Sequence, residues 1–193
     1  MKERALFLHR DGVIHREAGY VFRKEQVQFV EGIFSLCRTA KRLGYRLVVV
    51  SYQPGLARGV FTQADYAGLM CWMREEFRRE RIAFDGIFHC PSGVKSMTLE
   101  GNGGCRPGAG MLRRAARDLR LELSESVLVG SRKIDVAAAN AGGLRRAFLL
   151  RGSEKSTGGG ANATVNSLGE VEAWLVEQAK GANQRPTSRF LAA

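Results

Sequence analysis

Short apolar runs alternate with longer amphipathic stretches along the chain. Continuous apolar runs bounded by turn or charged residues are typical of strands that are buried on both faces of a parallel sheet, and an apolar repeat of about 3.6 residues indicates a helix. This alternation predicts an α/β fold, with a parallel sheet covered by helices on both faces. The predicted strands are residues 5–8, 46–50, 86–89, 127–129 and 147–149, and the predicted helices are residues 33–43, 63–80, 110–119, 133–140 and 168–178.

The length of 193 residues predicts a single domain, which we place at residues 1–180. Residues 91–110 and 151–162 are rich in small and turn-forming residues and indicate surface loops. Residues 181–193 show no periodicity, which predicts a disordered tail. No apolar run reaches the roughly 18 residues of a membrane span, and no apolar signal stretch precedes the first strand, so we expect a cytoplasmic protein with no membrane contact.

The net charge of +11 raises the question of an anionic partner. The arginines are spread over several predicted helices, and no aromatic-interleaved basic stripe accompanies them, which argues against nucleic acid. A positive field also favours a phosphorylated small molecule. We therefore expect a phosphorylated small molecule as the ligand, with a protein partner as an alternative.

Two candidate catalytic side chains follow the first predicted strand. His9 and Asp11 stand where this buried strand runs into an Asp-Gly turn, and open α/β sheets bind their ligands at the carboxyl ends of the strands. Asp11 could also serve only to form the turn, and His9 could be a hydrogen-bonded core histidine. Their position favours a role in a site.

The residues around this turn resemble a known family. The run Phe7-Leu8-His9-Arg10-Asp11-Gly12 is similar to the first motif of the haloacid dehalogenase (HAD) phosphohydrolases, in which a first aspartate attacks phosphorus and a second acts as general acid and base. The run Gln53-Pro54-Gly55-Leu56-Ala57-Arg58-Gly59 narrows the resemblance to the D-glycero-D-manno-heptose 1,7-bisphosphate and histidinol-phosphate phosphatases. This resemblance covers residues 5 to about 178. It implies a HAD-like Rossmannoid sheet with a minimal cap.

Several family positions carry other residues in this chain. His9 stands at the attacking aspartate, and Ser131 replaces the leading acidic residue of a pair that holds Mg²⁺, so that only Asp135 remains as a weak metal ligand. Asp135 could equally cap the helix that follows it. Because Mg²⁺ prefers anionic oxygens, we expect no cofactor, or at most a poorly held Mg²⁺.

The resemblance also implies the residues that contact substrate or phosphate. It assigns Ser51 to the phosphoryl group, Tyr52 to the pocket and Arg58 to the substrate, with Gln53 beside them. The family lysine is replaced by Arg106 in one register and deleted in the other. A structural zinc would have only Cys90 and Cys105, unless His89 turns toward them, and two thiolates are too few for a closed zinc site.

Three hypotheses about function follow from these substitutions. The first, which we favour from the sequence, is a protein impaired as a phosphatase that acts by binding a phosphorylated ligand or a partner. The second is an enzyme with a rebuilt, metal-independent mechanism that uses His9 and Asp11 on a sugar phosphate or related substrate, since histidine is a competent nucleophile. The third is a basic interaction protein that binds nucleic acid or an acidic partner.

Overall fold

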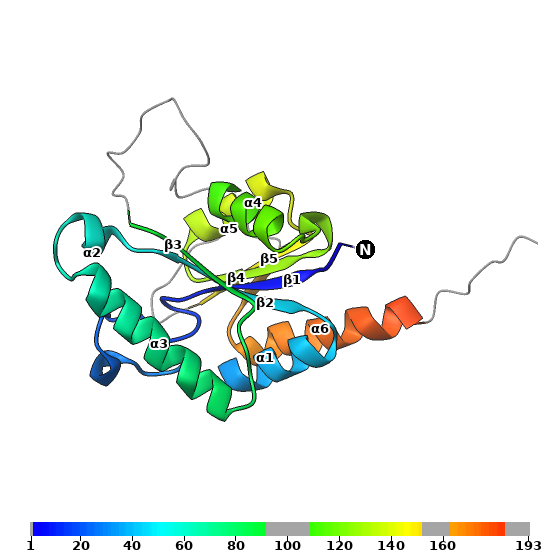
Figure 1. The fold of residues 1–193 in the computed structure, drawn as a ribbon. Helices are drawn as coiled ribbons and strands as arrows, with labels where there is room; N and C mark the ends of the chain where they lie inside the picture. The colour runs from blue at the N-terminus through cyan, green and yellow to red at the C-terminus, as the bar shows by residue number, and fades with distance from the viewer. Residues whose placement is uncertain (1, 92–108, 152–162, 184–193) are drawn as a thin grey trace, which may run out of the picture.

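The computed structural model describes residues 2–91, 109–151 and 163–183. Its centre is a six-stranded sheet in the order β3-β2-β1-β4-β5-β6, and every pair of neighbouring strands is parallel. This confirms the predicted α/β class, and Figure 1 shows the strands running between two layers of helices. The strands are β1 (Ala5–His9), β2 (Arg46–Tyr52), β3 (Gly86–Cys90), β4 (Val127–Gly130), β5 (Arg146–Leu150) and β6 (Ala163–Val165).

The α-helices lie on both faces of the sheet. In Figure 1, α4 and α5 cover one face, whereas α1, α3 and α6 lie on the other. Short 3-10 helices, η1 (Lys24–Gln26) and η2 (Leu123–Glu125), are part of the connections. The α-helices are α1 (Ile33–Arg42), α2 (Pro54–Ala57), α3 (Gln63–Arg79), α4 (Ala109–Asp118), α5 (Lys133–Gly142) and α6 (Leu168–Asn183).

The central strand β1 shows why the apolar runs build this sheet. Four of its five residues are fully buried, with alternate side chains on opposite faces. Leu6 and Leu8 pack in the core beneath α1, α3 and α6, whereas Ala5 and Phe7 pack in the core beneath α4 and α5. Because helices cover both faces of β1, a ligand can reach the strand at its carboxyl end. Open parallel sheets bind their ligands at this end of the strands.

Some elements differ from the prediction. Strand β6 and helix α2 were not predicted, because β6 has only 3 residues and α2 has only 4, too few to show periodicity. Helix α6 continues to Asn183, so the predicted start of the tail at residue 181 is wrong. The predicted loops at 91–110 and 151–162 lie almost entirely outside the described residues, as does the rest of the tail.

The helices begin and end where local chemistry predicts. Helix α3 begins after Thr62, whose side chain accepts a hydrogen bond from the Asp65 amide while the Asp65 carboxylate accepts one from the Thr62 amide. Helix α5 is followed by Gly143, whose positive φ of +74° is a conformation that glycine commonly adopts directly after a helix. Within the described part of the chain, no helix combines the length and the apolar character needed to cross a membrane.

Candidate functional site

The turn after β1 brings the candidate residues to the carboxyl edge of the sheet. The Gly12 amide donates to the His15 carbonyl at 2.8 Å, and the Ile14 amide donates to the Arg10 carbonyl at 3.1 Å, which closes the turn. Gly12 has a φ of +79°, and a Cβ there would lie 2.5 Å from Ser131 Oγ. Any larger residue would push apart the ends of β1 and β4. The Ser131 hydroxyl donates to the Asp11 carbonyl at 3.0 Å and ties these two ends together.

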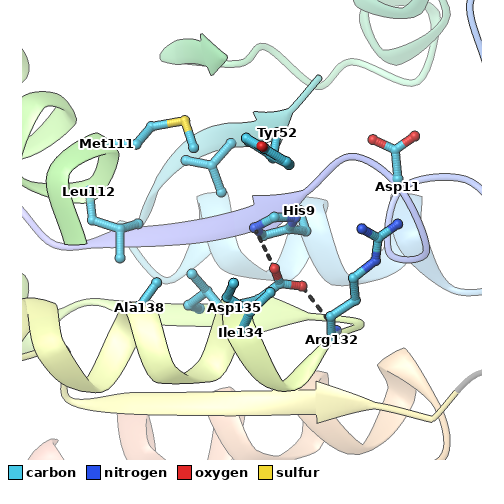
Figure 2. Close-up of a pocket in the computed structure, with 11 residues that line it drawn as sticks. His9, Asp11, Tyr52, Met111, Leu112, Arg132, Ile134, Asp135 and Ala138 are labelled. Atoms are coloured by element: carbon cyan, nitrogen blue, oxygen red, sulfur yellow. Dashed lines mark hydrogen bonds and ion pairs between the residues drawn. The ribbon is translucent and has the colours of Figure 1, made fainter. Parts of the chain in front are cut away.

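His9 lies beside Asp135. Its Nε2 atom is 3.2 Å from Asp135 Oδ1, a distance that makes an ion pair when the imidazole is protonated. The His9 side chain is 15% exposed and that of Asp135 5% exposed, so the contact is largely shielded from water. Figure 2 shows the ring and the carboxylate facing one another between β1 and α5. The contact leaves His9 Nδ1 as the nitrogen that Asp135 does not engage.

The other oxygen of Asp135 stabilises the start of α5. Asp135 Oδ2 accepts hydrogen bonds from the Ser131 amide at 3.1 Å and the Arg132 amide at 3.0 Å. Arg132 is the N-cap residue of α5 and Ser131 directly precedes it, so the two amides lie at the helix start, where backbone N–H groups have no partner within the helix. Asp135 therefore caps α5, as one of its two sequence interpretations stated, and orients its remaining oxygen toward His9.

His9 and Asp135 border a pocket with a cavity volume of about 150 Å³. Its polar lining comes from the ends of β1 and β2 and from the start of α5, while α4 and the middle of the strands give it apolar walls. Figure 2 shows Met111 and Leu112 of α4 on the side opposite Arg132 and Asp11. The lining residues are His9, Asp11, Val50, Tyr52, Met111, Leu112, Leu128, Arg132, Ile134, Asp135 and Ala138.

Asp11 is held by a buried arginine. Arg10 is 1% exposed, and its Nε and Nη2 atoms donate to the two Asp11 carboxylate oxygens at 3.1 and 2.8 Å. Arg10 Nη2 also donates to the Val21 carbonyl and to Gln53 Oε1. Burial by itself would raise the pKa of the Asp11 carboxyl, but the adjacent Arg10 guanidinium outweighs burial and holds that pKa below its usual value.

Two more predicted residues belong to the network around Asp11. Gln53 Nε2 donates to Asp11 Oδ2 at 2.9 Å and also to the Ser51 hydroxyl, and Ser51 Oγ lies 3.4 Å from the same Asp11 oxygen. Ser51 and Gln53 are buried, whereas Tyr52 lies between them in sequence and lines the pocket. At the end of β2, Val50 and Tyr52 thus face the pocket while Ser51 between them faces Asp11, as the two-residue period of a strand requires, and Gln53 follows the strand.

His15 lies beside Asp11 but does not line the pocket. Its Nδ1 atom is 2.8 Å from the Arg16 carbonyl, and its Nε2 atom is 3.5 Å from Asp11 Oδ1. The ring is 0% exposed, and its Nε2 has no hydrogen-bond partner among the described residues. Burial is the largest influence on the pKa of His15 and lowers it below its usual value, although the Asp11 carboxylate opposes this.

The structure places Arg58, one of the two predicted arginines, away from the pocket. Arg58 is exposed, and its Nη1 donates to the Tyr20 hydroxyl at 2.7 Å; it is not among the residues that line the pocket. Arg106, like the Cys105 of the proposed zinc pair, lies outside the described residues. Among the described residues, the arginine that lines the pocket is Arg132, which forms an ion pair with Glu17. Figure 2 shows its guanidinium beneath the Asp11 carboxylate.

The donors near Asp135 do not fit a magnesium ion. One Asp135 oxygen is engaged by two backbone amides and the other faces His9, while Ser131 offers only a neutral hydroxyl that already donates to Asp11. Mg²⁺ needs an octahedral set of oxygens, with anionic ligands that are free to bind it. Among the described residues, no group of three or more histidine, cysteine, aspartate or glutamate side chains could hold a metal ion.

Sequence reasoning missed Arg10, His15 and Arg132. A fully buried arginine has no signature in the hydrophobic pattern, because long charged side chains are usually exposed. The four-residue spacing of Asp11 and His15 across an Asp-Gly turn could have suggested that their side chains meet. Arg132 directly precedes α5, at a helix start that the sequence analysis identified.

Comparisons with known proteins agree on one class. A family model described as HAD-hydrolase-like matches residues 105–171. A D-glycero-alpha-D-manno-heptose-1,7-bisphosphate 7-phosphatase of Burkholderia mallei is 40% identical over 154 residues, which cover 78% of this chain and 81% of the relative. A D-glycero-beta-D-manno-heptose-1,7-bisphosphate 7-phosphatase of Vibrio cholerae is 34% identical over 186 residues, which cover 93% and 100% of the two chains.

Solved structures share the same fold. The D,D-heptose 1,7-bisphosphate phosphatase of B. bronchiseptica, solved with magnesium and phosphate, has a TM-score of 0.78 and 24% identity, covering 91% of this chain and 99% of that chain. A protein from Mesorhizobium loti described as a HAD-like phosphatase has a TM-score of 0.74 and 28% identity, covering 92% of this chain and 88% of that chain. These likenesses confirm the HAD-like sheet predicted from the sequence.

The comparisons overturn the function that we favoured from the sequence. Relatives that are 33–40% identical over most of this chain carry phosphatase names, whereas the sequence analysis favoured a binding protein impaired in catalysis. That hypothesis is wrong. It treated His9 and Ser131 as losses, and the structure places both in contacts that organise the site.

Proposed function

Because the chain belongs to the heptose bisphosphate phosphatase family of HAD-like hydrolases, we propose that it is an enzyme that releases phosphate from a phosphorylated sugar of the heptose bisphosphate class. The observation that carries this proposal is the contact between His9 Nε2 and Asp135 Oδ1, 3.2 Å apart at the border of a pocket that Asp11 also lines. A histidine oriented by a carboxylate is a common arrangement for nucleophilic and general-base catalysis.

His9 is the proposed nucleophile. When Nε2 carries its proton beside Asp135, Nδ1 has a lone pair that can attack phosphorus. The new N–P bond forms as the P–O bond to the sugar breaks, and the electron pair of that bond stays on the leaving oxygen. The imidazole becomes cationic in this step, and the Asp135 carboxylate stabilises the positive charge.

Asp11 is the proposed proton donor to the leaving oxygen. In the second step a water oxygen attacks phosphorus, the N–P bond breaks with its electron pair returning to His9, and the water gives up a proton to Asp11. Asp11 thus ends the cycle as it began. Since Arg10 lowers the pKa of Asp11, the carboxyl alone is a poor store for this proton at neutral pH.

We propose that the reaction needs no divalent metal. A histidine nucleophile is neutral before attack, so it does not repel a phosphate dianion as a carboxylate does, and the metal has less charge to offset. Arg132 supplies a cation at the pocket, and the engaged oxygens of Asp135 support the same conclusion. Tyr52 is positioned to contact the sugar, whereas Ser51 and Gln53 act on Asp11.

The test is phosphate release from a panel of sugar mono- and bisphosphates and histidinol phosphate, measured with Mg²⁺ and with EDTA. We expect release from a heptose 1,7-bisphosphate that survives EDTA and is lost in His9→Ala. His89→Ala is the matched control, because the His89 ring contacts Tyr66 and does not line the pocket. Absence of release from every substrate would refute the proposed function.

The intermediate gives a second, separate readout. A phosphorylated histidine is acid-labile, so a rapid quench under alkaline conditions should retain one phosphoryl group on wild-type protein and none on His9→Ala. Release that continues in His9→Ala would refute His9 as the nucleophile, and release that stops in EDTA would refute the metal-independent mechanism.

A further inference from the structure

The hydrogen bond at one nitrogen of His15 determines what the other nitrogen can do. His15 Nδ1 lies 2.8 Å from the Arg16 carbonyl, which can only accept, so Nδ1 carries a hydrogen. In the neutral ring, Nε2 is then a bare acceptor. It lies 3.5 Å from Asp11 Oδ1, and that oxygen is also an acceptor when the carboxyl is ionised.

Two acceptors that face each other in a buried place repel unless a proton lies between them. The His15 ring is 0% exposed and the Asp11 side chain 16% exposed, so bulk water does not separate the two atoms freely. One proton added to the pair turns an unfavourable contact into a charge-assisted hydrogen bond. Because the groups interact closely, such a proton belongs to the pair rather than to either residue.

When the pocket holds no anion, burial and the nearby charges disfavour protonation of the pair. Burial lowers the pKa of His15, and Arg10 lowers the pKa of Asp11. An anionic phosphate in the pocket that Asp11 lines brings negative charge and favours uptake of one proton. The other groups that act on the pair are His9 at the end of β1, Glu17 after the turn, Tyr66 of α3 and Arg132 before α5.

Building on the proposed phosphatase function, we propose that His15 is a positioning residue that acts through Asp11: its Nε2 and Asp11 Oδ1 together hold the proton that the leaving oxygen receives. The pair takes one proton from solvent when the phosphate ester binds. Asp11 passes it to the leaving oxygen as the P–O bond breaks. The water that attacks the phosphorylated His9 then returns one proton to the pair.

Two esters whose leaving groups differ in their need for a proton distinguish this role of His15 from a purely structural one. A sugar alkoxide needs a proton in order to leave, whereas 4-nitrophenolate leaves without one, and general-acid assistance contributes about 10²–10⁴-fold. We expect His15→Asn to lower kcat/KM at least about 10-fold on the sugar phosphate and less than about 3-fold on 4-nitrophenyl phosphate. The value of kcat/KM reports only the steps through departure of the leaving group, whereas hydrolysis of phosphorylated His9 is common to both esters. His89→Asn, the same chemical change at a histidine that neither pairs with Asp11 nor lines the pocket, should lower neither. Equal losses on both esters with His15→Asn would overturn the proposal.

A double-mutant cycle tests whether His15 acts through Asp11. If it does, His15→Asn should cost little further activity in an Asp11→Asn background. A loss that persists in full in that background would assign His15 a role independent of Asp11. Thermal unfolding of each variant shows which of them remain folded, and His15→Gln serves as the second replacement if His15→Asn does not.

Imidazole ¹⁵N spectra test the proton without relying on turnover. The chain has 3 histidines, so the three ring systems can be assigned by single substitutions. Added inorganic phosphate should move the His15 Nε2 signal from the position of a bare ring nitrogen toward that of a protonated one, and Asp11→Asn should abolish the shift. An Nε2 signal unchanged by phosphate would overturn the proposal, whether or not the wild type releases phosphate. If the wild type releases phosphate from neither ester, the proposed function is refuted instead.

Discussion

The two sides of Asp11 are built differently. On the pocket side, His9 meets a single carboxylate among apolar walls and keeps 15% of its side chain exposed. On the other side, Arg10, His15, Ser51 and Gln53 are buried and surround Asp11 with polar atoms. The difference is that the proposed nucleophile has one carboxylate partner at the border of the pocket, whereas the proposed acid is fixed in position and its charge is set by buried neighbours that do not line the pocket.

The largest change should come from returning an aspartate to the pocket side. His9→Asp restores the residue that the family resemblance implies, yet it would place a second carboxylate next to Asp135 without a replacement for Ser131. We expect no phosphate release above background, with or without Mg²⁺. Strong Mg²⁺-dependent release from this single variant would show that the site binds metal after all. His9→Asp combined with Ser131→Asp is the companion variant, for which a trace of activity is expected.

The next largest change should come from breaking the buried side. Arg10→Met removes the cation bonded to both Asp11 oxygens and leaves a largely buried carboxylate without its partner. Removal of one member of a buried ion pair costs about 3–5 kcal/mol of unfolding free energy. Urea unfolding at pH 7 measures it. Arg38→Met is the control, because Arg38 pairs with Glu80 at the surface, and it should change the urea midpoint little.

The sequence predicts the pocket side of Asp11 better than it predicts the buried side. The sheet followed from its apolar runs, and His9, Asp11 and Asp135 followed from their places at strand and helix ends. The buried network did not, because nothing in the periodicity marks Arg10 or His15 as enclosed. The predicted function was wrong because each substituted residue was considered by itself. The role that we propose for His9 depends on its contact with Asp135, which lies 126 residues later in the chain. The cytoplasmic location and the absence of a metal stay predictions.

A smaller and more specific change should come from neutralising the partner of His9. Asp135→Asn can keep an oxygen for the backbone amides of α5 but removes the charge that stabilises the imidazolium. We expect kcat on the sugar phosphate to fall about 10²-fold, with little loss of thermal stability. A large loss of stability with an unchanged kcat would show that Asp135 only caps α5 and has no role in catalysis.

The pH dependence of the free energy of unfolding should report the burial of His15. The pKa of His15 is lowered in the folded protein, chiefly by burial, so the unfolded chain binds the proton more tightly. The stability that this contributes is present above the unfolded pKa of about 6.5 and is lost as pH falls toward the folded value, by at most about 1.4 kcal/mol per pH unit. Urea midpoints at pH 7.5 and pH 5.5 measure the loss. It should be smaller in His15→Asn, and an unchanged loss would show that the pKa of His15 is the same in the folded and unfolded states.

The smallest change should come from a residue that belongs to neither side. Arg58 lies on the exposed end of α2, where its guanidinium bonds to the Tyr20 hydroxyl and not to the pocket. Substitutions at such surface positions usually change stability by less than about 0.5 kcal/mol. We expect Arg58→Ala to unfold near the wild-type temperature and to raise KM for the sugar phosphate no more than about 3-fold, as Tyr20→Phe should, since each removes the same hydrogen bond. A KM raised 10-fold or more by Arg58→Ala, but not by Tyr20→Phe, would mean that Arg58 leaves Tyr20 to bind the substrate, and would restore the role that the sequence predicted for it.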